Sequence, residues 1–210
     1  MGLWDVHSHL LPEIDDGYLD QAGCIRMLEI YRECGIDHVV VTPHIYNPFV
    51  RTAVDRIRST FDWAKANAER IGISLHLGSE LYVADQKVLR AIPIRNRFVL
   101  VEFSLALPPS NLMEQLRKLV ADGFVPIIAH VERFMWLNPK QALVHRLKEM
   151  GCLLQGNVEA VESGAALPYL EAGLLDMLAT DNHGDERLPL GLVQALEQWP
   201  SVRKRMEEIW

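Results

Sequence analysis

Short apolar runs alternate with longer amphipathic stretches along this 210-residue chain. The apolar runs have the length of buried strands, and the stretches between them repeat their apolar positions at helical spacing. Seven runs predict strands: Leu3–His7, Asp37–Thr42, Ile73–Ser79, Arg97–Phe103, Val125–His130, Cys152–Asn157 and Leu175–Thr180. This alternation of strand and helix favours an α/β fold with a parallel sheet.

Helices are expected between these runs, and several glycines stand where helices should end. The predicted helices are Leu19–Cys34, Thr52–Ile71, Asn111–Asp122, Pro139–Met150 and Leu190–Trp199, with a short helix over Ala84–Arg90 and a last one over Ser201–Trp210. The connection after Asn157 is irregular. Seven strands rather than eight predict a distorted (β/α)7 TIM-like barrel, formed as a single domain over residues 1–210. An open doubly wound sheet is the competing architecture.

Composition limits the functional classes. The formal net charge of −7 argues against a nucleic-acid partner, which requires a basic surface. No apolar run has the length of a membrane span or the pattern of a signal peptide, so we expect a cytoplasmic protein without membrane insertion. Cys24, Cys34 and Cys152 form no CxxC pair, and none is followed six residues later by Arg. This spacing excludes the phosphate loop of cysteine-dependent phosphatases.

Polar residues occupy the C-terminal end of every predicted strand, and in six of the seven they include His, Asp or Glu. These ends are His7-Ser8-His9, Thr42-Pro43-His44, Gly78-Ser79-Glu80, Val101-Glu102-Phe103, Ala129-His130, Gln155-Gly156-Asn157 and Thr180-Asp181-Asn182-His183. In a parallel α/β barrel all these ends meet on one face, where active sites are built. The sequence therefore predicts an active site on that face.

Nine residues near these ends are candidate metal ligands: His7, His9, Asp16, His44, Glu80, Glu102, His130, Asp181 and His183. One metal ion takes about four to six ligands, so nine are too many for a mononuclear site. Three divalent metal ions that share a bridging carboxylate would use all nine. Imidazole and carboxylate ligands without thiolate suit Mn, Fe or Zn. Clusters of this kind activate water and stabilise both the attacking and the leaving oxygen.

Some assignments leave alternatives. Asp15 could replace Asp16 as a ligand. Arg133 and Arg187 follow ligand positions closely, where a guanidinium group can bind phosphate oxygens, although ion pairs with Glu132 and Asp185 are the alternative.

Three further histidines are left out of the predicted site. His38 lies early in its strand, His76 is interpreted as a core histidine, and His145 is expected on an exposed helix face.

In these motifs the chain resembles the PHP (polymerase and histidinol phosphatase) superfamily. Within it, the chain is most similar to bacterial protein tyrosine phosphatases of capsule and exopolysaccharide operons. The matching stretches occur in family order: Asp5-Val6-His7-Ser8-His9, Asp15-Asp16-Gly17, Thr42-Pro43-His44, Gly78-Ser79-Glu80, Val101-Glu102-Phe103, Ala129-His130-Val131-Glu132-Arg133, Leu154-Gln155-Gly156-Asn157 and Thr180-Asp181-Asn182-His183.

The resemblance implies the PHP fold, a distorted barrel with three metal ions, usually Mn2+. It implies a first metal held by the residues His7, His9, Glu80 and Asp181, a second by Glu80, Glu102 and His130, and a third by Asp16, His44 and His183. It also implies phosphate binding by Arg133 and Arg187, and a substrate such as the phosphotyrosine-rich tail of a bacterial tyrosine autokinase. The departures from the pattern are Val131, Ile45 and shortened loops between Asn157 and Arg187, which frame the mouth of the pocket.

The resulting hypothesis is direct metal-assisted hydrolysis of a phosphomonoester, carried by Arg133, Arg187, His44 and His183. Tyr46 and Phe49 are candidates either to stack on an aryl ring or to pack within the protein. The alternatives are a small-molecule phosphatase of the histidinol-phosphatase kind, a PHP nuclease and a non-catalytic metal-bound interaction module. An oligomer is possible under each of them.

Overall fold

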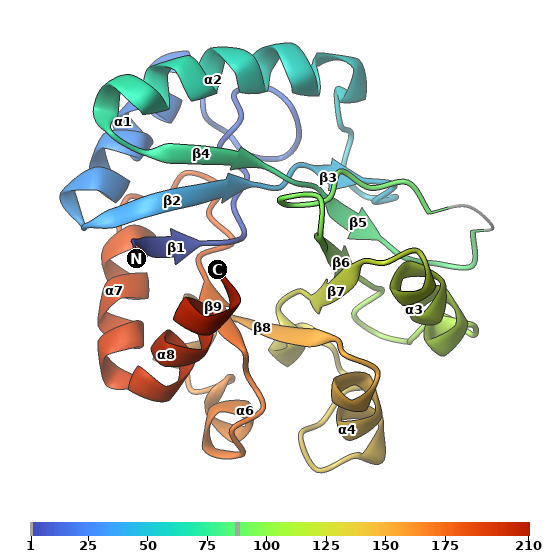
Figure 1. The fold of residues 1–210 in the computed structure, drawn as a ribbon. Coiled ribbons are helices and arrows are strands. Elements are labelled where there is room, and N and C mark those ends of the chain that lie inside the picture. Colours follow the sequence, from blue (N-terminus) through green and yellow to red (C-terminus); the bar gives the residue numbers. More distant parts are fainter. Residues whose placement is uncertain (1, 87–88) are drawn as a thin grey trace.

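The computed structural model describes residues 2–86 and 89–210 and has an α/β fold in which every ladder between named strands is parallel. The strands form two sheets (Figure 1). One sheet has the order β1 (Leu3–Asp5), β2 (Ile36–Val41), β4 (Ser74–Leu77). The other has the order β3 (His44–Ile45), β5 (Glu80–Tyr82), β6 (Phe98–Glu102), β7 (Val125–Ile128), β8 (Leu153–Asn157), β9 (Met177–Ala179).

Each of the seven predicted strands is present, and two short strands were not predicted. β3 follows β2 after the dipeptide Thr42-Pro43, and β5 follows β4 after Gly78-Ser79. Proline has no backbone N–H to donate to a neighbouring strand, so Pro43 separates β2 from β3. At Gly78 an added Cβ would lie 2.5 Å from Ile94, so only glycine fits there between β4 and β5. Two backbone hydrogen bonds hold the β2–β3 segment against the β4–β5 segment. They run from Gly78 N to the Val41 carbonyl (2.9 Å) and from Glu80 N to the Thr42 carbonyl (3.3 Å).

The two ends of the strand series also meet. Ser8, just beyond β1, forms a parallel bridge with Asn182, just beyond β9. His9 N donates to the Asn182 carbonyl (2.8 Å), and Asp181 N donates to the His7 carbonyl (2.9 Å). The segments that carry the first and last predicted ligands are therefore adjacent.

Helices surround the strands on the outside (Figure 1). They are α1 (Gln21–Glu33), α2 (Ile57–Ile71), α3 (Leu112–Ala121), α4 (Ala142–Glu149), α5 (Val158–Glu162), α6 (Leu167–Glu171), α7 (Leu188–Gln198) and α8 (Pro200–Ile209), with 3-10 turns at Val54–Arg56 and Val131–Arg133. No helix within the described ranges is long and apolar enough to cross a membrane.

The helix predictions are confirmed for all the longer segments, with ends shifted by a few residues. The exception is Ala84–Arg90. Residues 87–88 of that segment lie outside the described residues, and its described parts, 84–86 and 89–90, are not helical. α5 and α6 occupy the irregular connection after Asn157, where each was too short to show a periodic apolar pattern.

The core consists of apolar strand residues that are buried on both faces. All five residues of β6 are buried. Its Leu100 pairs with Ile127 of β7, and Ile128 pairs with Leu154 of β8. Strands covered on both faces carry continuous apolar runs, which explains the apolar pattern of β6 and β7.

The N-terminal ends of the strands carry an aromatic cluster away from the predicted ligands. Trp4 stacks on His38 (ring centroids 4.1 Å apart), on His76 (4.6 Å) and on Trp210 (4.9 Å). His38 Nδ1 lies 3.3 Å from His76 Nε2. Burial lowers the pKa of His76 to about 4, and His38, Arg95 and Lys65 act in the same direction. Burial also lowers the pKa of His38, against the opposing charge of Asp37.

We expect the free energy of unfolding to fall as the pH drops from about 6.5 towards 4. In this range an unfolded His76 binds a proton, whereas the folded cluster keeps His76 neutral, so the unfolded state binds more protons. His76→Phe keeps a ring for the stack and removes the titration. Denaturant unfolding at pH 7 and pH 5 should show the parent losing about 1 kcal/mol more than the variant, a figure reduced for partial exposure. Equal losses in the two proteins would contradict the assignment.

Candidate metal centre

A pocket of about 450 Å3 opens at the C-terminal ends of the strands. Seven of the nine predicted ligands line it, and the other two, His7 and His9, are buried beneath them. The pocket lining includes Asp16, His44, Glu80, Glu102, His130, Asp181 and His183. The structure therefore brings all nine side chains into one region.

The first group of converging side chains consists of His7, His9, Glu80 and Asp181. The two imidazole Nε2 atoms lie 3.2 Å apart. Glu80 Oε2 is 3.3 Å from each of them, and Asp181 Oδ1 is 3.2 Å from His7 and 3.4 Å from His9. Four donors bound tetrahedrally to one ion at about 2.0–2.2 Å would lie about 3.3–3.6 Å from one another. This spacing fits a divalent metal ion.

A second group consists of His44, Glu80 and Glu102. His44 Nδ1 lies 2.9 Å from Glu102 Oε1 and 3.1 Å from Glu80 Oε2. His130 contacts the other oxygen of Glu80, with its Nε2 2.9 Å from Oε1. Its buried Nδ1 has no hydrogen-bond partner within the described residues, so the ring has one nitrogen that the protein does not satisfy. Glu80 thus touches both groups and has the position of a bridging carboxylate.

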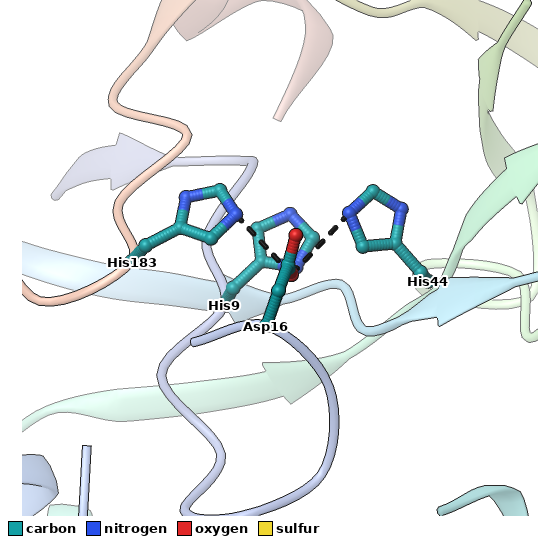
Figure 2. Close-up of side chains that lie close together, drawn as sticks. All are labelled: His9, Asp16, His44 and His183. Atoms are coloured by element: carbon teal, nitrogen blue, oxygen red, sulfur yellow. Dashed lines mark ion pairs between the residues drawn. The ribbon is translucent and has the colours of Figure 1, made fainter. Parts of the chain in front are cut away.

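The third group lies nearest to solvent and is drawn in Figure 2. It consists of His9, Asp16, His44 and His183. Asp16 Oδ1 is 3.4 Å from His183 Nε2 and 3.5 Å from His44 Nε2, the two ion pairs marked there. Asp16 is partly exposed, whereas His9 is fully buried. The group is therefore open on the side of Asp16.

Charge balance makes these side chains interdependent. Burial would raise the pKa of Glu80, but His7, His130 and His9 together hold it well below its ordinary value. Burial would lower the pKa of His44, but hydrogen bonds to Asp16 and Glu102 raise it to about 10. The protons on the imidazoles thus neutralise buried carboxylates, which is the task that divalent cations perform in metal centres.

A layer of polar residues orients the predicted ligands. Asp15 accepts a hydrogen bond from His9 Nδ1 (2.7 Å) and another from His44 N (3.1 Å), so Asp15 positions two ligands while Asp16 joins the third group. Asn47 Nδ2 donates to Glu102 Oε1 (2.7 Å). Such outer contacts fix the direction of a metal ligand.

Within this layer, Gln155 connects to more of the predicted ligands than Asp15 or Asn47 does. Its Oε1 accepts from His7 Nδ1 (3.2 Å) and from His130 N (2.9 Å). Its Nε2 donates to Asn157 Oδ1 (2.8 Å), and Asn157 Nδ2 donates to Asp181 Oδ2 (3.0 Å). One side chain of β8 therefore holds three predicted ligands, directly or through Asn157.

Gln155, Asn157 and Asn47 are functional candidates that were not predicted from the sequence. The available signal was that β8 ends in Gln155-Gly156-Asn157, two amides where the other strands end in His, Asp or Glu. Amides combine a donor and an acceptor, which suits them to connect an imidazole to a carboxylate.

Two predicted ligands and a neighbouring tyrosine have left-handed backbones, with φ of 32° at His130, 52° at Asp181 and 64° at Tyr46. Bulky residues avoid this region, and such strain concentrates at functional sites. The turns direct the side chains that follow β7 and β9 into the pocket.

The two predicted phosphate-binding arginines differ. Arg133 lines the pocket, and its Nη1 lies 3.3 Å from Asp181 Oδ2. Arg187 is 85% exposed and pairs with Asp185 through Nη2 to Oδ2 (2.6 Å) and Nε to Oδ1 (3.1 Å). The structure therefore places Arg133 at the cluster and Arg187 outside the pocket lining, in the ion pair that was the alternative for it.

His38 and His76 lie at the opposite ends of the strands, and His145 is exposed on α4, so none of the three joins the cluster.

A parallel α/β fold with converging imidazoles and carboxylates at the C-terminal strand ends defines a candidate metal-dependent hydrolase. The donor set, its spacing and the unpaired His130 Nδ1 all suit bound divalent metal ions. The chain belongs to the capsular polysaccharide synthesis family CpsB/CapC, which matches residues 3–208.

Similarity to individual proteins is consistent with this family membership. The tyrosine-protein phosphatase CpsB of Streptococcus pneumoniae is 27% identical, with 92% of this chain and 88% of that protein covered. The tyrosine-protein phosphatase YwqE of Bacillus subtilis is 26% identical, with 85% and 76% covered. A solved structure described with YwqE from Bacillus subtilis and CpsB from Streptococcus pneumoniae, metal-dependent tyrosine phosphatases, matches with a TM-score of 0.78 at 23% identity. The match covers 98% of this chain and 87% of the solved chain, and it shows that the two proteins share a fold.

We expect Gln155→Leu to weaken Mn2+ binding by about 10- to 100-fold, because His7 and His130 lose their common acceptor. Isothermal titration calorimetry of the metal-free protein measures this affinity. Gln115→Leu is the matched control, since Gln115 is equally buried and bonds instead to the Gln86 carbonyl. The control should lose stability and keep its metal affinity. A similar affinity loss in both variants would indicate a general packing defect.

Proposed function

We propose that this protein is a metal-dependent protein tyrosine phosphatase. The observation that carries the proposal is the convergence of nine imidazole and carboxylate side chains in one pocket with Arg133 at its edge. Membership of the CpsB/CapC family and the names of the similar proteins support it. The substrate we propose is a phosphotyrosine protein, such as the bacterial tyrosine autokinase that controls capsule or exopolysaccharide synthesis.

The cluster is proposed to hold three divalent metal ions, Mn2+ in preference to Fe or Zn. The first group would hold one ion, and Asp16, His44 and His183 of the third group would hold a second. Glu80, Glu102 and His130 would hold the remaining one, with His44 close enough to share it. When bound, such ions make water a stronger nucleophile and neutralise phosphoryl charge.

The chain's own residues position the phosphate and its leaving group. Arg133 presents a half-exposed guanidinium at the pocket, where its remaining N–H groups can donate to phosphoryl oxygens. His44 and His183 face the open side of the cluster, on either side of Asp16 (Figure 2). Water oxygen bonds to phosphorus as the phosphorus–oxygen bond to tyrosine breaks, and the proton that the water gives up ends on the departing tyrosine oxygen. The leaving phenolate is weakly basic, so it needs little help from a general acid.

A single domain organised as a distorted (β/α)7 barrel is the proposed architecture. The bridge between Ser8 and Asn182 supports it, because it connects the last strand to the first. The hydrogen bonds that join β2–β3 to β4–β5 support it as well. A cytoplasmic location is part of the same proposal.

The experiment that tests the function is reconstitution of the metal-free protein with Mn2+, Fe2+, Zn2+ or Mg2+, with metal counted per chain. Hydrolysis of a phosphotyrosine peptide should return with about three bound ions. Preference for a small alkyl phosphate such as histidinol phosphate would assign the small-molecule phosphatase instead. Release of nucleotides from single-stranded DNA would assign the nuclease. Full occupancy without turnover on any substrate would assign the non-catalytic module.

We expect His130→Ala to lower kcat for phosphotyrosine peptide by at least about 100-fold, because Glu80 loses its contact and the cluster loses a ligand. His145→Ala is the matched control, since His145 is exposed on α4. The control should keep full activity, and circular dichroism should show both variants folded. Retained turnover in His130→Ala would remove this histidine from the proposed centre.

We expect Arg133→Ala to reduce kcat/KM by about 100- to 1000-fold, the range for loss of one charge-stabilising donor. Arg187→Ala should cost less, because Arg187 is already bound to Asp185. Steady-state kinetics on the same peptide compares the two. A larger loss in Arg187→Ala would mean that the Asp185 pair opens when substrate binds, and would restore the role predicted for Arg187.

A further inference from the structure

Large apolar side chains are exposed around one side of the pocket. They lie on three loops that follow β3, β6 and β7. We call them the apolar rim: Tyr46, Phe49, Leu105, Leu107 and Met135. Phe49 is 86% exposed, Met135 84% and Leu107 72%. Each of the three loops also contributes residues to the pocket lining, so these exposed side chains border one site. Exposed apolar side chains grouped around one site mark binding surfaces, whereas isolated ones are common.

The apolar rim is continuous with the candidate metal centre. Phe49 and Leu105 line the same pocket as Glu80, Glu102 and His130. Met135 N donates to the Leu105 carbonyl at 2.9 Å, so the loop after β7 is attached to the loop after β6. A ligand whose phosphate sits in the pocket would therefore have these side chains beside it.

The loops are held in place by specific contacts. Asn47 bonds Glu102 through Nδ2 at 2.7 Å, and its Oδ1 accepts from Phe49 N at 2.9 Å. Phe49 is thus fixed relative to a predicted metal ligand. On the other side Trp136 Nε1 donates to the Ser104 carbonyl at 2.9 Å.

An aromatic layer supports the loop that carries Leu105 and Leu107. Phe134 stacks on Trp136 with ring centroids 5.0 Å apart, and Phe103 packs edge-on against both. Phe103 and Phe134 are fully buried, so their contacts stabilise the fold, whereas the exposed side chains above them do not. The rim side chains are therefore presented on a packed base while remaining in water.

We propose that the apolar rim binds apolar side chains that flank the phosphotyrosine of a polypeptide substrate, an inference that rests on the proposed function. An extended peptide advances about 3.3 Å per residue, so the residues next to a phosphotyrosine in the pocket reach the loops that carry Phe49 and Leu105. The five rim side chains bear no formal charge, although the chain as a whole has a net charge of −7. The five rim side chains thus provide contact area for apolar neighbours of the phosphotyrosine, while Arg133 is reserved in the proposal for the phosphate itself. A small phosphate ester would leave Leu107 and Met135 uncovered.

The test uses two phosphotyrosine peptides that differ only at the residues on either side of the phosphotyrosine, Leu in one and Ser in the other. For the Mn2+-loaded protein we expect kcat/KM to be about tenfold higher for the Leu peptide, mainly through KM. The double variant Phe49→Ser, Leu105→Ser, which changes the two rim side chains that line the pocket, should reduce this ratio to about twofold or less. Leu190→Ser, at an exposed leucine of α7, is the matched control and should keep the full ratio.

A second measurement separates failure of this inference from failure of the proposed function. Non-hydrolysable phosphonate analogues of the two peptides are titrated by fluorescence anisotropy. If the Leu analogue binds more tightly and the double variant loses this preference, the rim proposal is supported, whether or not the phosphopeptides are hydrolysed. Absence of hydrolysis would refute only the proposed phosphatase activity. Equal affinities, or a preference that survives in the double variant, would overturn the rim. The rim proposal would also be overturned if sedimentation analysis showed that the parent is a dimer and the double variant a monomer. A second copy of the chain would then occupy the surface.

Discussion

Glu80 is a buried carboxylate that touches four imidazoles, and the arrangement of the strand ends depends on it. His7 and His9 come from the end of β1, His44 from β3 and His130 from the end of β7, so three separate parts of the chain meet at one side chain. A carboxylate that is 1% exposed is costly unless it is paired. The same requirement holds for the imidazoles, whose burial is offset by Glu80, Glu102 and Asp181. The cluster is therefore stable only as a whole, and removal of one member leaves buried charge without a partner.

The parallel strands make this meeting possible, because parallel ladders align the ends of all strands on one face. Backbone bonds between the segments after β1 and β9 bring Asp181 next to His7. Asp5 reinforces the same junction, since it accepts hydrogen bonds from Tyr31 of α1 (2.7 Å) and from Thr180 N (3.0 Å). The opposite strand ends carry the Trp4 stack, which binds no predicted ligand. Stability and chemistry are thus placed at different ends of the same strands.

The sequence predicted the seven main strands, the longer helices and the nine members of the cluster, because each follows from a local pattern or from a motif at a strand end. What it could not predict depends on contacts between distant residues. The breaks that create β3 and β5 arise from Pro43 and from the contact of Gly78 with Ile94, sixteen residues away. The role of Gln155 requires that β8 lie next to β7, which no local pattern encodes. The phosphate role of Arg187 stays a prediction: the motif favoured it, with the Asp185 ion pair as the alternative, and that local pair is present in the structure.

Asn47 contacts both the predicted metal centre and the loop at the pocket entrance. One atom of its amide bonds Glu102 in the cluster, and the other fixes Phe49 at the mouth of the pocket. The left-handed backbone of Tyr46 turns the chain so that both bonds form, which gives a physical reason for a strained tyrosine two residues after His44. A rearrangement of Glu102 on metal binding would therefore move the apolar side chain at the pocket entrance. In this structure one amide side chain therefore holds both a predicted metal ligand and the backbone of the loop at the pocket entrance.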